Sequence, residues 1–177
     1  MINRFIVLFC VVLISLFAFV RMSKHNPEST NKELVWMTSL DEAMKLSEKS
    51  KKPILANFTG SDWCGWCVKL SKEVFDTPEF KIWAQKNVIL LELDYPRNKP
   101  QTEAIKQQNA GLQQAFKVQG FPTIWVFNLT KDDVTKKYNI TPIGKTGYVA
   151  GGTKAFTDTV DSMIAYFKLP KLEKIKP

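Results

Sequence analysis

Short apolar segments with the character of buried strands alternate with amphipathic segments along most of this 177-residue chain. Strands are expected at residues 54–58, 88–94 and 123–127, with a weaker pattern within 134–149. Helices are expected to begin at Ser39, Cys64, Thr77, near residue 101, and at Thr153. Strands that alternate with helices are joined by crossovers that cover the sheet from both sides. The order therefore predicts one α/β domain over residues 33–170, with a mixed central sheet and helices on both faces.

Residues with short polar side chains mark the expected helix starts. Ser39 and Thr77 are suited to accept a hydrogen bond from the first free backbone N–H groups of the helices that follow them. Thr153 is expected to cap the final helix in the same way. Gly111 costs its helix about 1 kcal/mol relative to alanine. We therefore expect the regular part of that helix to begin at Leu112.

The first residues form a segment of different character. Residues 5–20 are an unbroken apolar run between Arg4 and Arg21, as in an export signal. No small-x-small cleavage site follows, so a cleaved signal peptide and an uncleaved membrane anchor both stay open for residues 1–22. Residues 23–32 are polar and are expected to be a linker. Either alternative predicts an exported protein, periplasmic or otherwise extracytoplasmic, in an oxidising compartment.

The charges of the chain are spread out. The net charge is +8, and the first 25 residues hold Arg4, Arg21 and Lys24, which leaves 22 basic and 17 acidic residues in the rest. The basic tail at residues 171–177 belongs to the single basic cluster of note. Nucleic-acid binding needs a concentrated basic face, so we expect no nucleic-acid partner.

Cys64 and Cys67 stand two residues apart directly after an expected strand and turn. The third cysteine, Cys10, lies in the apolar export segment. A structural zinc site needs four ligands, but the chain has no second cysteine pair, and its single histidine, His25, lies in the linker. A purely structural disulfide would close a very short loop and constrain the unfolded chain little. The spacing therefore favours a redox pair and no metal.

A strand that leads through a turn into a helix would place Cys64 at the helix N-terminus. Backbone N–H groups favour the thiolate there. Cys67, one turn further, would lie within bonding distance and more deeply buried. Cys64 would then attack a substrate disulfide and Cys67 would resolve the mixed disulfide. Trp63 and Trp66 would make an apolar rim that suits an extended peptide, with ordinary packing as the alternative role of each.

The segment Trp63-Cys64-Gly65-Trp66-Cys67 resembles the active site of the thioredoxin family, whose usual pattern is WCxxC. Residues 109–123 resemble the family's stretch that ends in Gly-x-Pro-Thr, and the similarity covers residues 33–170. Within the family, Lys52-Pro53 and residues 73–78 are similar to exported single-domain members and to the C-terminal domain of membrane disulfide-interchange reductases. The resemblance implies a thioredoxin-like fold whose redox group is the Cys64–Cys67 disulfide, with no cofactor.

The resemblance also implies the substrate-binding residues. Pro122 would be the family's cis-proline facing the cysteines, and Phe121 would offer its backbone to the substrate as an added strand. The expected substrate-binding set is Trp63, Gly65, Trp66, Phe121 and Pro122, beside the catalytic Cys64 and Cys67. The sequence departs from the family at Asn57, which stands where the family has a buried acid beneath the second cysteine.

Trp66 is the second departure, because reducing thioredoxins have proline there, and oxidants and isomerases have histidine. Without a histidine to stabilise the Cys64 thiolate, we expect a reductase or exchanger rather than a strong oxidant. The resemblance thus implies a protein-disulfide oxidoreductase that acts on exported proteins, with a protein thiol donor that a membrane-bound protein could supply. The alternative from another class is a redox-inert binding module or chaperone on the same scaffold, consistent with Asn57 and the two tryptophans.

Overall fold

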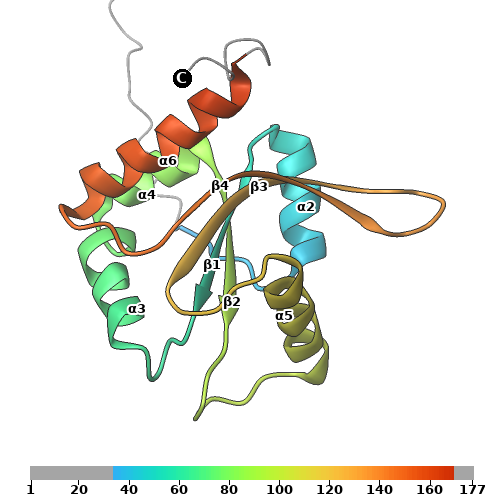
Figure 1. Ribbon diagram of the computed structural model, residues 1–177, viewed down its shortest axis with the longest axis horizontal. Coiled ribbons are helices and arrows are strands. Elements are labelled where there is room, and N and C mark those ends of the chain that lie inside the picture. Colours follow the sequence, from blue (N-terminus) through green and yellow to red (C-terminus); the bar gives the residue numbers. More distant parts are fainter. Residues whose placement is uncertain (1–33, 170–177) are drawn as a thin grey trace, which may run out of the picture. The chain divides into compact units, whose positions relative to one another are not determined.

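A mixed sheet forms the centre of the structure, a computed structural model that describes residues 34–169. Its four strands are β1 (Ile54–Thr59), β2 (Ile89–Asp94), β3 (Thr123–Lys131) and β4 (Tyr138–Thr146), in the order β2-β1-β3-β4. β1 is parallel to β2 and antiparallel to β3, and β3 is antiparallel to β4 (Figure 1). All of the expected strands are present.

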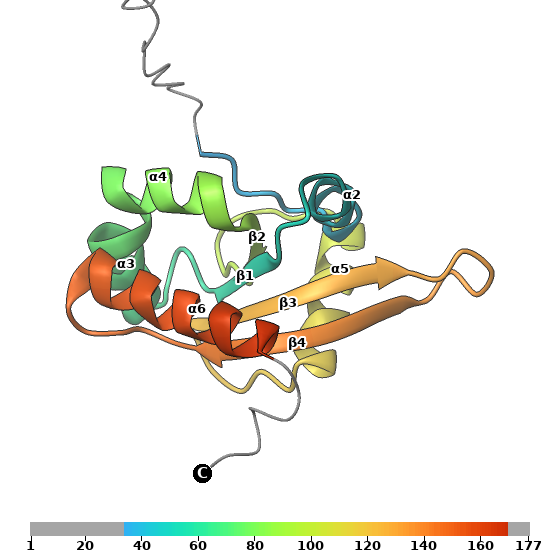
Figure 2. The same ribbon diagram turned by 90° about the horizontal axis from the view of Figure 1, so that it is seen from above.

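Helices cover both faces of this sheet, as the sequence predicts (Figures 1 and 2). They are α2 (Leu40–Ser50), α3 (Gly65–Leu70), the π-helical turn η1 (Ser71–Phe75), α4 (Pro78–Asn87), α5 (Glu103–Ala115) and α6 (Gly152–Lys168). α2 and α5 lie on one face, and α3, α4 and α6 lie on the other. The thioredoxin-like α/β fold is confirmed.

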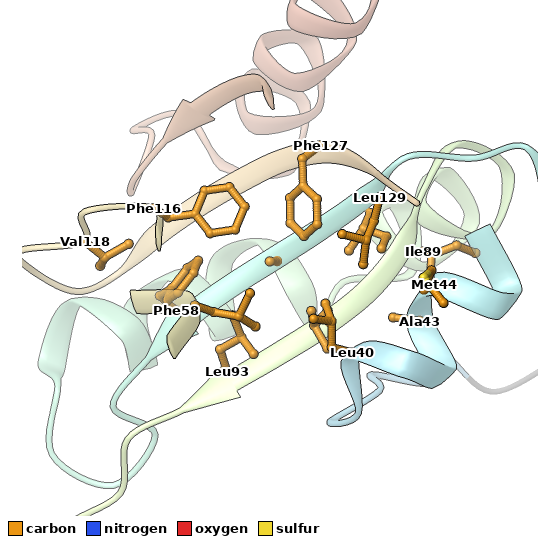
Figure 3. Close-up of a cluster of buried hydrophobic side chains, with 14 residues drawn as sticks. Leu40, Ala43, Met44, Phe58, Ile89, Leu93, Phe116, Val118, Phe127 and Leu129 are labelled. Carbon is orange, nitrogen blue, oxygen red and sulfur yellow. The ribbon is translucent and has the colours of Figure 1, made fainter. Parts of the chain in front are cut away.

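Every residue of β1 is buried, because helices cover it on both sides. Side chains alternate across a strand, so Ile54, Ala56 and Phe58 join the core under α2 and α5, whereas Leu55 joins the core under α3, α4 and α6. Figure 3 shows the first of these cores, in which Phe58, Phe116 and Phe127 lie among aliphatic side chains. By the same alternation Asn57 lies on the α3 side of the sheet.

The second core is rich in aromatic rings. Phe75, Phe80 and Phe156 lie with ring centroids 4.9 to 6.1 Å apart. Trp36, from the segment before α2, adds a further ring, 5.0 Å from Phe75 and 6.4 Å from Phe80. This cluster joins η1, α4 and α6, and it fixes the far end of the helical segment that begins at the cysteine motif.

Two of the expected helix caps are confirmed. Ser39 Oγ accepts from the Glu42 N–H at 3.4 Å, and Thr77 Oγ1 accepts from the Phe80 N–H at 3.2 Å. The expected start of the regular helix at Leu112 is wrong, because α5 begins at Glu103 and runs through Gly111 without a break. The burial of Asn109 and Leu112 on its inner face offsets the cost of the glycine.

The expected cap of the last helix by Thr153 is wrong. α6 begins at Gly152 after Gly151, whose φ of 105° lies in the left-handed region, and no side chain caps it. The Thr153 hydroxyl instead lies 2.7 Å from Thr77 Oγ1 and 3.3 Å from the carbonyl oxygen of Glu73. The Thr153 hydroxyl thus makes tertiary contacts with η1 and with the residue before α4 instead of capping α6.

A short segment before α2 extends the sheet beyond β2, which the sequence did not suggest. Met37 pairs with Leu91 in a parallel bridge. The Met37 N–H donates to the Leu90 carbonyl oxygen at 3.0 Å, and the Glu92 N–H donates to the Met37 carbonyl oxygen at 2.7 Å. The outer edge of β2 is therefore covered at this point.

The predicted export segment at residues 1–22, the linker at 23–32 and the basic tail at 171–177 lie outside the described residues. Within residues 34–169, no helix is long and apolar enough to cross a membrane. The predicted domain boundaries at residues 33 and 170 stay predictions.

Candidate active site

The cysteine motif begins where β1 turns into α3. The N–H groups of Trp63 and Cys64 both donate to the Gly60 carbonyl oxygen, at 3.2 and 2.9 Å. Cys64 is the N-cap of α3, and its sulfur accepts from the Cys67 N–H at 3.2 Å. The expected position of Cys64 at a helix N-terminus is thus present, with a backbone donor directed at the sulfur.

Cys64 and Cys67 are joined in a disulfide, with their Cα atoms 5.2 Å apart. Cys64 is 7% exposed and Cys67 is 5% exposed. In this form the two residues are buried to nearly the same degree, so the expected contrast in burial is absent. Both residues lie within one helical turn, at a Cα separation that a disulfide normally spans.

Trp63 is held against the end of β2. Its indole Nε1 donates to the Tyr95 carbonyl oxygen at 2.8 Å, and the Arg97 guanidinium lies 4.1 Å from the ring centroid. The Asp62 carboxylate accepts from the Arg97 N–H at 3.0 Å, and the hydrogen bonds from the Arg97 and Asn98 N–H groups lower the pKa of Asp62. Trp63 is 38% exposed, so part of the residue remains available at the surface.

Trp66 is more open, with 59% of its surface exposed. Its ring packs on Tyr148 at 5.2 Å between centroids. The Tyr148 hydroxyl donates to the Glu73 carboxylate at 2.5 Å, and Lys69 Nζ donates to the same carboxylate at 2.5 Å. The bonds from Lys69 and Tyr148 lower the pKa of Glu73, and the bond to Glu73 raises the pKa of Tyr148. The side chain beneath Trp66 is therefore fixed by a charged network.

The Phe121–Pro122 peptide bond is cis, as the resemblance implies. The Phe121 ring stacks on Tyr95 at 4.9 Å and meets the edge of Trp63 at 5.9 Å between centroids. This contact brings the loop before β3 against the cysteine motif. Gly65 has nothing within 4 Å of the position where a Cβ would stand, so the surface beside Cys64 is open.

A cavity of about 400 Å³ lies behind Cys67, between α3, η1 and the sheet. Its lining includes Asn57, Cys67 and Glu92. Asn57 is 6% exposed, and its Oδ1 has no hydrogen-bond partner within the described part of the chain. The amide that stands in place of the family's acid is therefore buried in the expected region.

Glu92 is the residue of this region that the sequence analysis missed. Burial raises the pKa of the Glu92 carboxyl, and the nearby Asp94 raises it further, whereas Lys99 lowers it. In the sequence Glu92 stands within an apolar strand. An acid that interrupts such a run was the one signal that could have drawn attention to it.

Metal ligands are sparse in this part of the molecule. Within residues 34–169, no group of three or more His, Cys, Asp or Glu side chains could hold a metal ion. The redox group of the site is the disulfide itself.

A disulfide at the N-terminus of a helix, beside a cis-proline loop and on a mixed sheet covered on both faces, defines the class of thioredoxin-fold thiol–disulfide oxidoreductases. The family model of the thioredoxin-like domain matches residues 40–139, so the chain belongs to the thioredoxin family. The predicted family and enzyme class are confirmed.

Relatives whose names refer to thioredoxin or to disulfide reduction are similar to this chain. The chain is 36% identical over 126 residues to the disulfide bond reductase DsbH of Chlamydia pneumoniae, covering 71% of this chain and 70% of DsbH. It is 33% identical over 132 residues to the thioredoxin-related protein DsbJ of the same organism, covering 74% of this chain but 37% of DsbJ. A solved structure of a DsbH oxidoreductase has a TM-score of 0.64 at 32% identity, covering 82% of this chain and 96% of that chain.

Proposed function

We propose that the protein reduces or exchanges disulfides in exported proteins, with Cys64 as the attacking sulfur and Cys67 as the resolving sulfur. The observation that carries the proposal is the Cys67 N–H that donates to the Cys64 sulfur at the start of α3. A donor in that place stabilises negative charge on sulfur, which lowers the cost of forming the nucleophilic thiolate.

The chemistry takes place in two displacements. The Cys64 thiolate attacks one sulfur of the substrate disulfide, forms a mixed disulfide and releases the other substrate sulfur as a thiolate. The Cys67 thiolate then attacks the Cys64 sulfur, which restores the Cys64–Cys67 disulfide and releases the second substrate thiolate. The substrate gains two electrons and the protein loses two. A protein thiol donor returns them by reducing the Cys64–Cys67 disulfide, and no cofactor is needed.

The substrate would bind across an open apolar surface. Trp66 is 59% exposed and Trp63 38% exposed, and Gly65 between them leaves space for a chain to approach. Phe121 and Pro122 would supply the backbone edge beside this surface, since the Phe121 ring already contacts Trp63. An extended peptide can use the backbone groups of such a loop as it would use a strand edge.

The proposed direction is reduction or mild exchange. Trp66 stands between the cysteines and offers no charge to stabilise the Cys64 thiolate further, and the similar DsbH is named a reductase. The predicted export segment supports an extracytoplasmic location for the enzyme, the periplasm in a bacterium, either released or tethered through residues 5–20. A donor at the membrane would suit the tethered form.

Turnover of insulin disulfides with dithiothreitol as donor tests the activity. Wild-type protein should accelerate the reduction, and Cys64→Ser should return the rate to the background of dithiothreitol alone. Equal rates for the two proteins would refute the proposal. Holding of unfolded clients that survives replacement of both cysteines would favour a redox-inert chaperone instead.

Equilibration of the pair against glutathione tests the direction. A potential of roughly −270 mV is expected for a reductase, whereas a value of roughly −120 mV would mark an oxidant.

A further inference from the structure

Glu92 and Asn57 occupy paired positions on neighbouring strands. Asn57 of β1 lies opposite Glu92 of β2 in the parallel register. Leu55 and Leu90, which precede these residues by two positions, both join the core under α3, α4 and α6. Because side chains alternate along a strand, Asn57 and Glu92 lie on that same side. Both line the cavity behind Cys67.

The cavity behind Cys67 has room for water and a polar wall. Its volume of about 400 Å³ leaves room for water, and Thr59, Ser61 and Ser71 add hydroxyl groups to its wall. The buried Asn57 Oδ1, which has no partner within residues 34–169, supplies a free acceptor for such a water. Asn57 itself has no proton to exchange at ordinary pH, because its amide does not titrate.

We propose that Glu92 accepts the proton of the Cys67 thiol through water in this cavity when Cys67 resolves the mixed disulfide. The proposal deepens the function proposed above and rests on it. The S–H bond of Cys67 breaks and its proton passes to the Glu92 carboxylate. The sulfur forms its new bond to Cys64 as the Cys64–substrate bond breaks, and the substrate leaves as a thiolate.

The charged groups around Glu92 lie on its own strand, in the loop after β2, and in η1 and at its end. Asp94 lies on the same strand and is held by the Ser61 N–H at 2.8 Å and the Ser61 hydroxyl at 2.6 Å. Lys99, from the loop after β2, donates to the Ser61 hydroxyl at 3.0 Å. Lys72 and Asp76, from η1 and its end, line the same cavity.

The environment makes Glu92 a better base than an ordinary carboxylate. Burial first and Asp94 second raise the pKa of Glu92, with Lys99 opposing them. A carboxyl pKa closer to that of a thiol lowers the free energy needed to move the proton from the thiol to the carboxylate. Glu92 is only half-buried, so it can also return its proton to water.

Two other acids close to the motif, Asp62 and Glu73, are poorly suited to this role. Asp62 accepts hydrogen bonds from backbone N–H groups, and Glu73 is bound by Lys69 and Tyr148. Both sets of bonds lower the pKa of the carboxyl concerned. Each of these carboxylates is therefore a weaker proton acceptor than Glu92.

The pH dependence of Cys67 reactivity tests the proposal without turnover. In the Cys64→Ser background, alkylation of Cys67 by iodoacetamide reports how much of it is thiolate at each pH. Glu92→Gln removes a neighbouring negative charge, so the alkylation profile should move to lower pH. Glu103→Gln is the matched control, because Glu103 is on α5 with 72% of its side chain exposed. Profiles of all three proteins that coincide would overturn the proposal.

The rate of resolution supplies the second readout. Reduced protein is mixed with a model disulfide in a stopped-flow instrument, and the formation of the Cys64–Cys67 disulfide is followed. Glu92→Gln should slow resolution by about 10²-fold near neutral pH, and the loss should shrink as the pH rises, since hydroxide then takes the proton. Asn57→Asp, which places a carboxyl at the paired position, should restore part of the rate in the Glu92→Gln protein.

These outcomes separate the proposal from the function on which it rests. A loss of rate that is equal at every pH would show a structural role for Glu92 and would overturn the proposal. Normal insulin turnover with an unchanged Glu92→Gln profile would leave the function intact and refute the proton transfer. A shifted alkylation profile in a protein that turns over no insulin would support the coupling of Glu92 to Cys67 and refute the function.

Discussion

The Trp63 indole Nε1 donates a hydrogen bond to the carbonyl oxygen of Tyr95 at 2.8 Å, which ties the first residue of the cysteine motif to the end of β2. Phe121 completes this arrangement, because its ring stacks on Tyr95 at 4.9 Å and meets the edge of Trp63 at 5.9 Å. Three segments far apart in the sequence thus meet at the rim of the site. The shape of the rim depends on each of them.

The Trp63 ring packs directly against Gly60, and a side chain at position 60 should displace the ring. A Cβ on Gly60 would stand 2.6 Å from the indole Nε1, which is closer than real contacts allow. We expect Gly60→Ala to break the Trp63–Tyr95 hydrogen bond and to change the tryptophan fluorescence. The melting temperature should fall by several degrees, because overpacking usually lowers the free energy of unfolding by about 1 to 3 kcal/mol.

Gly65→Ala is the matched control for this substitution. A Cβ on Gly65 would meet nothing within 4 Å, and alanine is favoured over glycine in a helix by about 1 kcal/mol. Thermal melts should therefore place Gly65→Ala at or above the wild type. A Gly60→Ala protein as stable as Gly65→Ala would contradict the packing described for Trp63.

Phe80 is the ring on which the aromatic cluster depends. It is fully buried and contacts Trp36, Phe75 and Phe156. Phe80→Ala should reduce the free energy of unfolding in urea by about 3 to 5 kcal/mol, because it removes a large side chain and leaves a cavity. Ile82→Ala on the same helix, 58% exposed, should cost far less. Similar losses for the two variants would show that the cluster does not hold the helices.

Asp41 should add a pH-dependent contribution to stability. Hydrogen bonds from the Tyr138 hydroxyl at 2.8 Å and Lys131 Nζ at 3.0 Å lower the pKa of Asp41. A lowered pKa in the folded state gives stability that is present above the unfolded value of 3.8 and is lost as the pH falls through the folded value.

Asp41→Asn should therefore destabilise the protein at pH 7 by no more than about 1 kcal/mol, because the pair is half-exposed. Urea unfolding should show the difference between wild type and variant shrinking below pH 4. If the difference in free energy of unfolding stayed the same from pH 7 to strongly acidic solution, the lowered pKa of Asp41 could not be its cause.

The contribution of Glu92 to stability should depend on pH in the opposite direction. A raised carboxyl pKa in the folded state means that the contribution of Glu92 is favourable below its unfolded value of 4.5 and is lost as the pH rises through the folded value. Glu92→Gln should therefore melt at a higher temperature than the wild type at pH 8 and at the same temperature at pH 4. A variant that is less stable at pH 8 would contradict the burial of this charge.

Much of the fold could be predicted because it rests on local patterns. The apolar run at residues 54–58 and the Thr77 cap need no knowledge of the rest of the chain. The Cys64–Cys67 pair could be found for the same reason, since strand, turn and helix follow each other directly.

The features that were missed depend on tertiary contacts. The hydroxyl of Thr153 bonds to η1 and Thr77 instead of capping α6, which no local rule anticipates. Met37 pairs with Leu91 as a single bridge without a strand pattern of its own. The importance of Glu92 depends on its register with Asn57 and on the cavity that both share with Cys67, and neither is visible along one strand.

Trapping of the mixed disulfide tests the assignment of the two sulfurs most directly. Cys67→Ser, Cys64→Ser and the double variant are each incubated with a reducible disulfide protein, quenched with an alkylating agent, and analysed by non-reducing electrophoresis and mass spectrometry. Cys67→Ser should accumulate a covalent adduct joined through Cys64, whereas the other two should give none. An adduct that forms through Cys67 in the Cys64→Ser protein, or the absence of any adduct with Cys67→Ser, would contradict the assignment.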